Sequence, residues 1–198
     1  VLYYSGAYEK GNYVDNMLNG KGIYINSKGV KYEGEFLNDE FHGKGTRTWP
    51  NGTTYTGDFV KDSITGSGKL LEFDDDGNFK SEFVGEFLDG DLHGKGSSKW
   101  YDGQIYTGEY RRGLRHGKGE LLDNDGSKYI GLFKNGFADG FGVKTWAEGD
   151  KYEGEWIDGW RTGKGKYSWK SGSTYEGEFF EGKLQGNGFL KYSSGDSY

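Results

Sequence analysis

The chain has 198 residues but no cysteine and a single proline, Pro50. Without cysteine it can form neither disulfide bonds nor thiolate sites for zinc. No stretch approaches the roughly 20 apolar residues that a membrane-spanning helix needs. With so little proline and with 18% aromatic residues, the composition excludes a collagen and argues against a disordered low-complexity tract.

Long blocks of like charge are also missing. The net charge is −6, and no like-charge block is longer than Asp74–Asp76. An acidic chain is poorly suited to binding nucleic acid, and we expect no nucleic-acid partner. The one compact basic group consists of Arg111, Arg112, Arg115 and Lys118. Such charges are usually solvated turn residues, and the alternative is weak binding of phospholipid headgroups.

Glycine is abundant, with 38 residues, and it recurs with a fixed period. A motif of the form aromatic-x-Gly-x-aromatic begins at Tyr32, Tyr55, Phe83, Tyr106, Tyr129, Tyr152 and Tyr175. Successive starts are 23 residues apart, except for 28 between the second and the third. A Gly-x-Gly pair begins nine residues after each motif glycine. This period indicates a repeat array, whose units stack to bury what one unit cannot.

Each repeat predicts a β-hairpin. In Lys31–Leu37 the polarity alternates, so the two motif aromatics share one face of a strand with Gly34. We expect a turn over 38–42, a second short strand over 46–49 and a turn at 50–52 that leads into the next repeat. Consecutive hairpins are expected to pair side by side. The predicted fold is therefore all-β, an elongated single-layer twisted antiparallel sheet.

The glycines and the aromatic residues have separate predicted uses. The motif glycine leaves room for a ring of the adjacent hairpin, and the Gly-x-Gly pair supplies positive φ or a backbone too crowded for a side chain. Four residues after that pair, five repeats carry a further ring, at Trp49, Trp100, Trp146, Trp169 and Tyr192. These rings are expected to stack on the tyrosine and phenylalanine ladder as an aromatic spine.

We predict one array of about eight repeats, at 4–31, 32–54, 55–82, 83–105, 106–128, 129–151, 152–174 and 175–197. Repeat 55–82 has five added residues, which are expected to extend its hairpin into an acidic tip. The first repeat either contains a five-residue insertion or holds two overlapping registers, one opened by Tyr4 and one with Gly11 as its glycine. Because Tyr198 stands where a further repeat would open, the array is expected to be part of a longer one.

The pattern Tyr-x-Gly-Glu-Phe/Trp, followed by Gly-Lys-Gly and an Asp/Asn-Gly turn, closely resembles the MORN repeat (membrane occupation and recognition nexus) over residues 4–198. The resemblance implies a scaffold without a cofactor and not an enzyme. It is most similar to the cytoskeletal MORN arrays of protists, such as those of the apicomplexan basal complex. That similarity implies a homodimer formed through terminal repeats, protein partners of the cytoskeleton, and a cytoplasmic location at the cytoskeleton or a membrane.

Two alternative functions remain open at this stage. One is direct binding of phospholipid, and the other is a role as accessory segment of a larger enzyme. No nucleophile elbow, phosphate-binding loop or dinucleotide motif occurs in these residues. The three histidines, His42, His93 and His116, recur at repeat spacing, about 10 Å apart at the nearest, so one metal ion cannot link them within a chain. A metal site shared across a dimer stays open.

Departures from the period supply the candidate binding residues. Phe137 and Trp160 follow turn glycines and are predicted partner contacts. Because a sheet that ends between repeats presents an unpaired edge, a homodimer contact is expected in the last repeats. The residues predicted for it are Tyr167, Trp169, Phe179, Phe189 and Tyr192.

Overall fold

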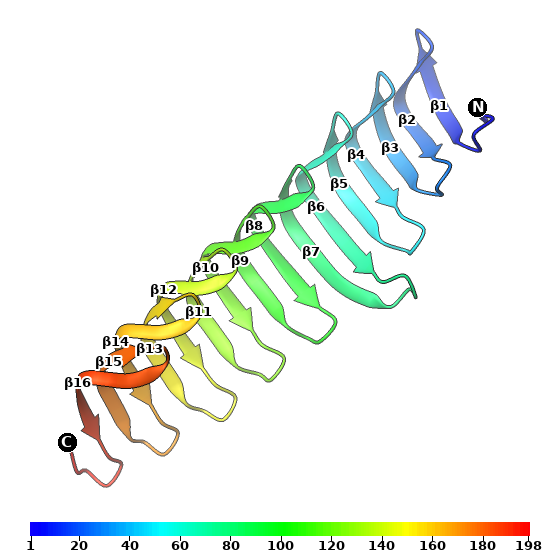
Figure 1. Cartoon of the computed structure of the whole chain (residues 1–198). Coiled ribbons are helices and arrows are strands. Elements are labelled where there is room, and N and C mark those ends of the chain that lie inside the picture. The colour runs from blue at the N-terminus through cyan, green and yellow to red at the C-terminus, as the bar shows by residue number, and fades with distance from the viewer. The chain divides into compact units, whose positions relative to one another are not determined.

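The computed structural model describes all 198 residues and contains strands and turns but no helix (Figure 1). The chain forms two compact units, an N-terminal unit over Val1–Tyr101 and a C-terminal unit over Asp102–Tyr198. The strands of the N-terminal unit are β1 (Tyr8–Val14), β2 (Met17–Ile25), β3 (Lys31–Leu37), β4 (Glu40–Thr48), β5 (Thr54–Val60), β6 (Ser63–Phe73), β7 (Phe79–Leu88) and β8 (Asp91–Trp100). Those of the C-terminal unit are β9 (Ile105–Arg111), β10 (Leu114–Leu122), β11 (Lys128–Lys134), β12 (Phe137–Thr145), β13 (Lys151–Ile157), β14 (Trp160–Ser168), β15 (Thr174–Phe180) and β16 (Lys183–Lys191).

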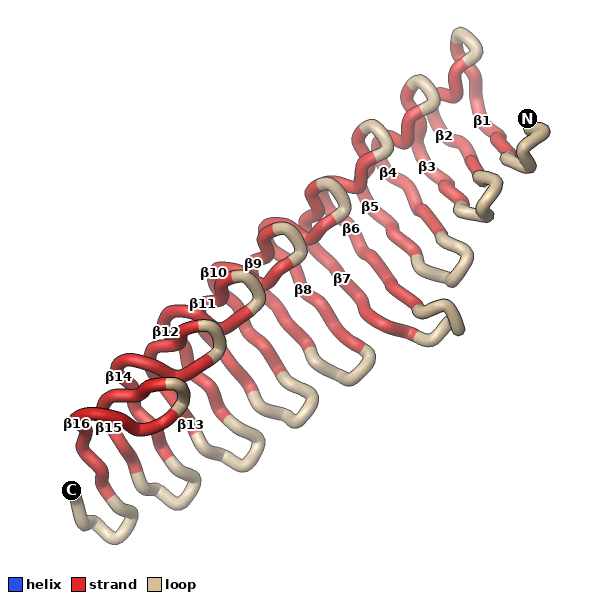
Figure 2. Tube along the Cα trace, viewed as in Figure 1, coloured by secondary structure: helices blue, strands red, loops and turns tan.

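Within each unit every strand pairs antiparallel with the next strand of the sequence. The turns inside the hairpins therefore follow one edge of each unit, and the loops between repeats follow the other (Figure 2). The prediction of an all-β array of antiparallel hairpin repeats is confirmed.

The hairpin turns are shorter than predicted. Asn38 and Asp39 have φ of 51° and 69°, and this pair of positive values closes a two-residue turn of the type that fits the twist of antiparallel strands. Strand β4 therefore starts at Glu40 and runs through the Gly-x-Gly pair. The predicted turn over 38–42 and short strand over 46–49 were wrong, because two residues suffice for the turn and the glycines allow the strand to bulge without ending.

The bulge lies at the same place in the regular hairpins. Gly34 pairs with Gly45, but the next residue, Glu35, pairs with His42. Gly43 and Lys44 are thus extra residues on β4, and Gly43 has φ of +64°. An extra residue pair bends the strand and increases its twist.

The motif glycines and the second glycines of the Gly-x-Gly pairs form one row across each unit. In register, the N-terminal row is Gly11, Gly22, Gly34, Gly45, Gly57, Gly68, Gly85 and Gly96. The C-terminal row is Gly108, Gly119, Gly131, Gly142, Gly154, Gly165, Gly177 and Gly188.

Glycine is required in this row because a ring lies on it. A Cβ on Gly45 would be 2.4 Å from the hydroxyl oxygen of Tyr32, and one on Gly34 would be 2.5 Å from the Cα of Gly45. Tyr32 belongs to the same hairpin as both glycines. The predicted room for a ring is therefore present, but the ring comes from the same hairpin and not from the adjacent one.

The core is a ladder of edge-to-face rings on this face of the sheet. Tyr32 contacts Phe36 of its own strand at 5.1 Å and Phe59 of the next hairpin at 5.0 Å between ring centroids. In the C-terminal unit Tyr152 contacts Trp156 at 5.2 Å and Phe179 at 4.9 Å. This arrangement matches the quadrupoles of the rings and links each repeat to the next.

The tryptophan position contributes less to this ladder than expected. Trp100 contacts Phe83 at 6.2 Å, whereas Trp146 and Trp169 both contact Tyr167. Trp49 lies against the guanidinium of Arg47 at 4.8 Å. The ring core is therefore built by the motif aromatics, Trp156 among them, and the tryptophans of the later position lie beside it.

Both irregular repeats have a simple structural explanation. The added residues of repeat 55–82 lengthen β6 and β7 to 11 and 10 residues, and Asp74–Asn78 forms their turn. Hydrogen bonds from the Asn78 side chain and backbone hold the pKa of Asp74 below its usual value. In the first repeat Gly11 pairs with Gly22 within the glycine row, which selects the register of Gly11, while Tyr4 lies outside the strand and is exposed.

Candidate functional site

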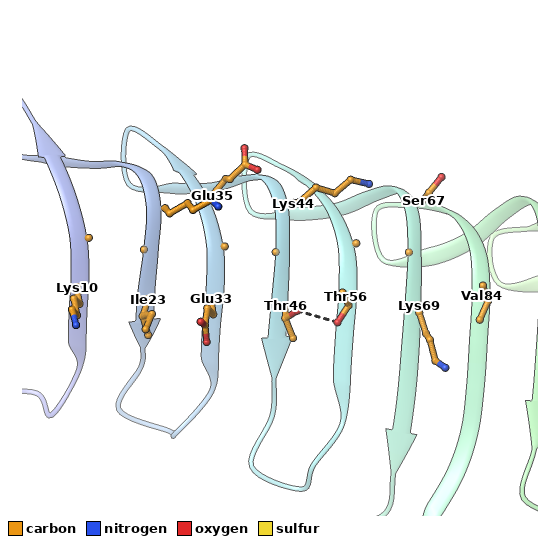
Figure 3. Close-up of a pocket in the computed structure, with 17 residues that line it drawn as sticks. Lys10, Ile23, Glu33, Glu35, Lys44, Thr46, Thr56, Ser67, Lys69 and Val84 are labelled. Atoms are coloured by element: carbon orange, nitrogen blue, oxygen red, sulfur yellow. Dashed lines mark hydrogen bonds between the residues drawn. The ribbon is translucent and has the colours of Figure 1, made fainter.

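The residues beside each row glycine face away from the aromatic core. In β3, Tyr32 and Phe36 are buried while Glu33 and Glu35 are exposed. We call this second face, opposite the tyrosine ladder, the open face. Figure 3 shows that its side chains form two rows, with Glu35, Lys44 and Ser67 in one row and Glu33, Thr46 and Thr56 in the other. The glycine row runs between them, so peptide backbone forms the floor of the open face.

In the N-terminal unit the floor is hollowed into a depression of about 890 Å³. Its charged lining residues are Lys10, Lys21, Lys44, Lys69, Glu33 and Glu35 (Figure 3). The hydroxyl oxygens of Thr46 and Thr56 lie 3.0 Å apart across its floor. The depression therefore combines exposed backbone with more cations than carboxylates, although the whole chain is acidic.

Carboxylates of the open face also stabilise the bulges. Asp58 accepts a hydrogen bond from the backbone N–H of Ser67 at 2.9 Å and pairs with the Lys44 ammonium at 2.6 Å. The hydrogen bond from Lys44, with the Ser67 N–H, lowers the pKa of Asp58. In the C-terminal unit Glu109, Glu155 and Glu178 accept the equivalent N–H bonds at 3.1, 3.3 and 3.3 Å.

A second depression, of about 720 Å³, lies on the open face of the C-terminal unit. Gly154, Gly165 and Gly177 form its floor, and Phe141 forms part of its wall. Its charged lining residues are Glu153, Glu176, Glu178, Lys164 and Lys166. Carboxylates thus outnumber cations here, the reverse of the N-terminal depression.

The predicted partner contacts lie at neighbouring hairpin turns. Phe137 is 57% exposed and Trp160 is 61% exposed. A Cβ on Gly159 would be 3.8 Å from Phe137, and one on Gly182 would be 3.4 Å from Trp160, so each ring reaches toward the turn of the next hairpin. Sequence reasoning missed Ile157 and Phe180, which are also exposed at these turns.

The basic group does not gather on one surface. Arg111, Arg112 and Lys118 are exposed, but the Arg115 guanidinium lies 5.8 Å from the ring centroids of both Tyr106 and Phe133. Arg115 occupies a position of the aromatic face, nine residues after the motif tyrosine. Strand alternation alone could have indicated this, because Leu114 and Arg115 must point to opposite faces.

The predicted dimer residues are also divided. Phe179 is buried in the core at 3% exposure, and Trp169 is half-buried. Tyr167 is half-buried, and its hydroxyl donates to Asp150 at 2.5 Å; burial and this bond raise the pKa of Tyr167 to about 12. Phe189 and Tyr192 are exposed, at 55% and 43%, on and just after β16. Only the last two offer surface to a partner.

The histidines occupy equivalent positions in three hairpins. The Nδ1 atoms of His42, His93 and His116 are buried and have no hydrogen-bond partner. No group of three or more His, Cys, Asp or Glu residues is arranged to hold a metal ion. No helix in the structure has the length and apolar character needed to cross a bilayer.

Comparison with protein families identifies the repeat. The sequence profile described as "MORN repeat" matches residues 10–31, 32–54, 83–105, 106–128, 129–151, 152–174 and 175–197. The matches omit 55–82, the repeat with added residues. No curated protein matches the chain by sequence.

Similar folds occur among solved structures. One is the TCP10 domain of Danio rerio CPAP in complex with a peptide of Danio rerio STIL, with a TM-score of 0.51, 12% identity, and coverage of 96% of this chain and 81% of that one. Another is the SAS-4 (dCPAP) TCP domain of Drosophila melanogaster in complex with a proline-rich motif of Ana2, with a TM-score of 0.49, 13% identity, and coverage of 88% and 91%. At these identities the likeness concerns the fold alone.

Proposed function

Because the chain belongs to the MORN repeat family, we propose that it is a non-catalytic scaffold that binds extended segments of partner proteins on its open face. The observation that carries this proposal is the glycine floor of the two depressions, of about 890 and 720 Å³. The floor exposes strand backbone on which an extended chain can lie, and the charged rows on both sides supply contacts that select its sequence.

The comparison with solved structures supports the proposal at the level of the fold. The TCP10 domain of CPAP, whose sheet resembles this one, is in complex with a peptide of STIL. A binding surface spread along the array also fits the repeats, since each repeat contributes similar residues.

The finer parts of the proposal concern assembly and location. We propose that the chain homodimerises through its last repeat and organises a membrane-associated cytoskeletal structure. Support for the dimer comes from Phe189 and Tyr192, which are exposed on and just after the outer strand β16; the backbone of this strand before Leu190 can pair with a further strand, whereas Leu190 already pairs with Tyr198. Sedimentation of the purified chain and of Phe189→Asp tests it: the wild type should form dimers and the variant monomers, and a concentration-independent wild-type monomer would refute the dimer.

Binding to the open face can be tested with peptides displayed on phage and selected on the full chain. Selected peptides should bind in solution with one-to-one stoichiometry, as measured by fluorescence anisotropy. The variant Thr56→Tyr/Ser67→Tyr places two rings in the N-terminal depression and should weaken, by at least tenfold, those peptides that bind there. As matched control, Lys61→Tyr/Asp62→Asn changes an exposed hairpin turn and should leave binding unchanged. Selection of no peptide that depends on either depression would refute the proposal.

Phospholipid binding is a second candidate, favoured by the hairpin turns of the C-terminal unit. Counted over the two central and two flanking residues of each turn, the four turns together carry four basic and two acidic residues. They also carry five exposed apolar residues, Leu114, Phe137, Ile157, Trp160 and Phe180. Basic residues beside exposed aromatic rings are typical of surfaces that bind anionic bilayers. Co-sedimentation with phosphatidylserine vesicles should be lost in Arg111→Glu/Arg112→Glu and at high salt; unchanged binding in both cases would exclude this candidate.

A further inference from the structure

One repeat departs from the others on the open face. In the hairpin of β11 and β12, the four open-face positions beside the pair Gly131–Gly142 hold Ile130, Leu132, Phe141 and Val143. The same positions hold Thr107, Glu109, Lys118 and Glu120 in the preceding hairpin. In the following hairpin they hold Glu153, Glu155, Lys164 and Lys166. We call the four apolar residues of β11 and β12 the apolar patch.

Packing within the chain does not explain the apolar patch. Ile130, Leu132 and Phe141 are 49%, 37% and 56% exposed, and the aromatic core of this hairpin lies on the opposite face, with Tyr129 and Phe133. Neighbouring apolar residues that are left outside a core mark a surface for interaction.

Leucine at position 132 also removes a contact that stabilises the fold elsewhere. Glu109, Glu155 and Glu178 stand at the equivalent position and accept the backbone N–H of the bulge in their hairpins. A leucine side chain has no acceptor atom, so the N–H of Phe141 cannot donate a hydrogen bond to it. A position at which a stabilising carboxylate is replaced by an exposed leucine is better explained by binding than by folding.

The surroundings of the apolar patch indicate what covers it. Phe141 lines the C-terminal depression, where Glu153, Glu176 and Glu178 stand against two lysines; Glu176 is 4.0 Å from Lys166, and the side chain of this glutamate is 73% exposed, so it can also accept from a partner. From β12, which carries Phe141, to β15, which carries Glu176, there are three inter-strand spacings, or roughly 14 Å. An extended chain that crosses the strands covers this distance in about four residues.

Building on the proposed binding of partner segments, we infer that the apolar patch is the anchor of the C-terminal depression. It takes an apolar side chain of an extended partner segment, and the same segment places a lysine or arginine beside Glu176, about four residues from the anchor. The glycines between these two positions contact the backbone of the segment. The occupant is therefore a peptide with an apolar residue and a basic residue at a fixed separation.

The test uses the full chain and a random-peptide library displayed on phage. Among selected peptides we expect enrichment of an apolar residue with a basic residue about four positions away. Fluorescence anisotropy with synthetic copies of these peptides should show binding at least tenfold weaker for Leu132→Glu/Phe141→Lys, which gives this hairpin the residues of the next one. The midpoint of urea unfolding should be unchanged or higher in that variant, because the new glutamate can accept the N–H of residue 141.

The matched control is Leu114→Glu/Phe180→Lys, which makes the same changes at exposed apolar residues outside the patch and should leave affinity unchanged. A third variant, Glu176→Lys, should weaken the selected peptides about tenfold and remove the preference for a basic residue. Peptides that bind Leu132→Glu/Phe141→Lys as tightly as wild type would overturn the inference. If peptides that are insensitive to Leu132→Glu/Phe141→Lys still lose binding in Thr56→Tyr/Ser67→Tyr, the open face binds peptides but the apolar patch is not the anchor. If no selected peptide responds to any of these variants, both the proposed function and the anchor are refuted.

Two other occupants are distinguishable outcomes. Wild-type dimers that dissociate in Leu132→Glu/Phe141→Lys would show that a second copy of the chain covers the patch. Loss of phosphatidylserine vesicle binding in this variant, without effect on peptides, would assign the patch to a membrane. Either outcome would overturn the assignment to a peptide.

Discussion

The two units share one frame but distribute apolar and charged residues in opposite ways. Nine residues after the motif aromatic, on the core face, the N-terminal unit has only apolar residues, whereas the C-terminal unit alternates arginine with apolar residues; the two sets are Phe41, Ile64 and Leu92, and Arg115, Ala138, Arg161 and Leu184. On the open face the N-terminal depression has four lysines and two glutamates with Ile23 and Val84 in its lining, whereas the C-terminal depression has two lysines and three glutamates with Phe141 in its wall.

The hairpin turns differ in the same sense. Each unit has four hairpin turns, and each turn is counted as its two central and two flanking residues. The four turns of the N-terminal unit together carry six acidic residues and one basic residue, and those of the C-terminal unit carry two acidic and four basic residues. The glycine row runs through both units, but the tyrosine ladder is complete only in the C-terminal unit, because the N-terminal unit has Glu9 and Phe83 at two of its four motif-tyrosine positions. Both units therefore form the same hairpins on a shared glycine row, and the positions outside this row are free to specify different partners.

The largest expected effect is on the shared frame. Gly45→Ala places a Cβ 2.4 Å from the Tyr32 hydroxyl, and Gly165→Ala places one 2.5 Å from the Tyr152 ring. Each substitution should lower the free energy of unfolding by about 3 kcal/mol, since neither the ring nor the paired strand can move away. Urea unfolding followed by circular dichroism measures this. Gly77→Asn is the control, because no atom lies near that position and asparagine tolerates positive φ; it should cost less than about 1 kcal/mol. A clear difference between the two units would contradict a common frame.

The next largest effect concerns the core-face position nine residues after the motif aromatic, which holds Leu92 in the N-terminal unit and Arg161 in the C-terminal unit. Leu92 is 4% exposed, and Leu92→Ala should cost about 3 kcal/mol. Arg161 lies 5.1 to 5.8 Å from four ring centroids and donates to the carbonyl of Gly182. Arg161→Leu should nevertheless change stability by less than about 1 kcal/mol, because burial of the leucine offsets the lost cation–π contacts. A loss as large as that of Leu92→Ala would show that the arginine is a required part of the C-terminal core.

The frame was readable from the sequence because it repeats. The 23-residue spacing, the alternation in Lys31–Leu37 and the glycine offsets together predicted the hairpins and the buried ring ladder. The start of β4 was not predicted, because a Gly-x-Gly pair reads as a turn although its positive φ at Gly43 produces a bulge inside a strand.

The candidate site was less accessible to sequence reasoning. The exposed positions of Phe137 and Trp160 follow from their turn glycines, but Leu132 and Phe141 are unusual only once the open face is recognised. The sequence itself contains this difference, because Leu132 stands where the motif of other repeats has a carboxylate. Its meaning required the structure, because a leucine in an aromatic-rich strand otherwise suggests a core residue.

A smaller effect follows from the tyrosine hydroxyls. Burial, the largest cause, raises the pKa of Tyr55 and of Tyr152 to about 12. A folded pKa above the unfolded value of about 10 means that the stabilisation is complete below pH 10 and is lost as the pH rises through about 12. The Arg161 cation favours tyrosinate at Tyr152, so Arg161→Leu should raise the pKa of Tyr152 further and leave Tyr55 unchanged. Tyrosinate absorbance during alkaline titration of the wild type and of Arg161→Leu measures this shift, and Tyr152→Phe identifies the contribution of Tyr152; an unchanged titration in Arg161→Leu would contradict the contact.

The smallest effect distinguishes two interactions of Asp58 on the N-terminal open face: its ion pair with Lys44 and the hydrogen bond that it accepts from the bulge N–H of Ser67. Lys44 and Asp58 are partly exposed, so Lys44→Ala should cost less than about 0.5 kcal/mol and nothing at high salt. Asp58→Ala should cost about 1 kcal/mol at any salt concentration, because the N–H of Ser67 loses its acceptor. The lowered pKa of Asp58 means that its contribution is present above about pH 4 and is lost as the pH falls through the folded pKa. Urea unfolding at low and high salt gives both values. Equal losses for the two variants would mean that the ion pair, and not the carboxylate on the bulge, stabilises the hairpin, and Leu132 would then carry no cost to the fold.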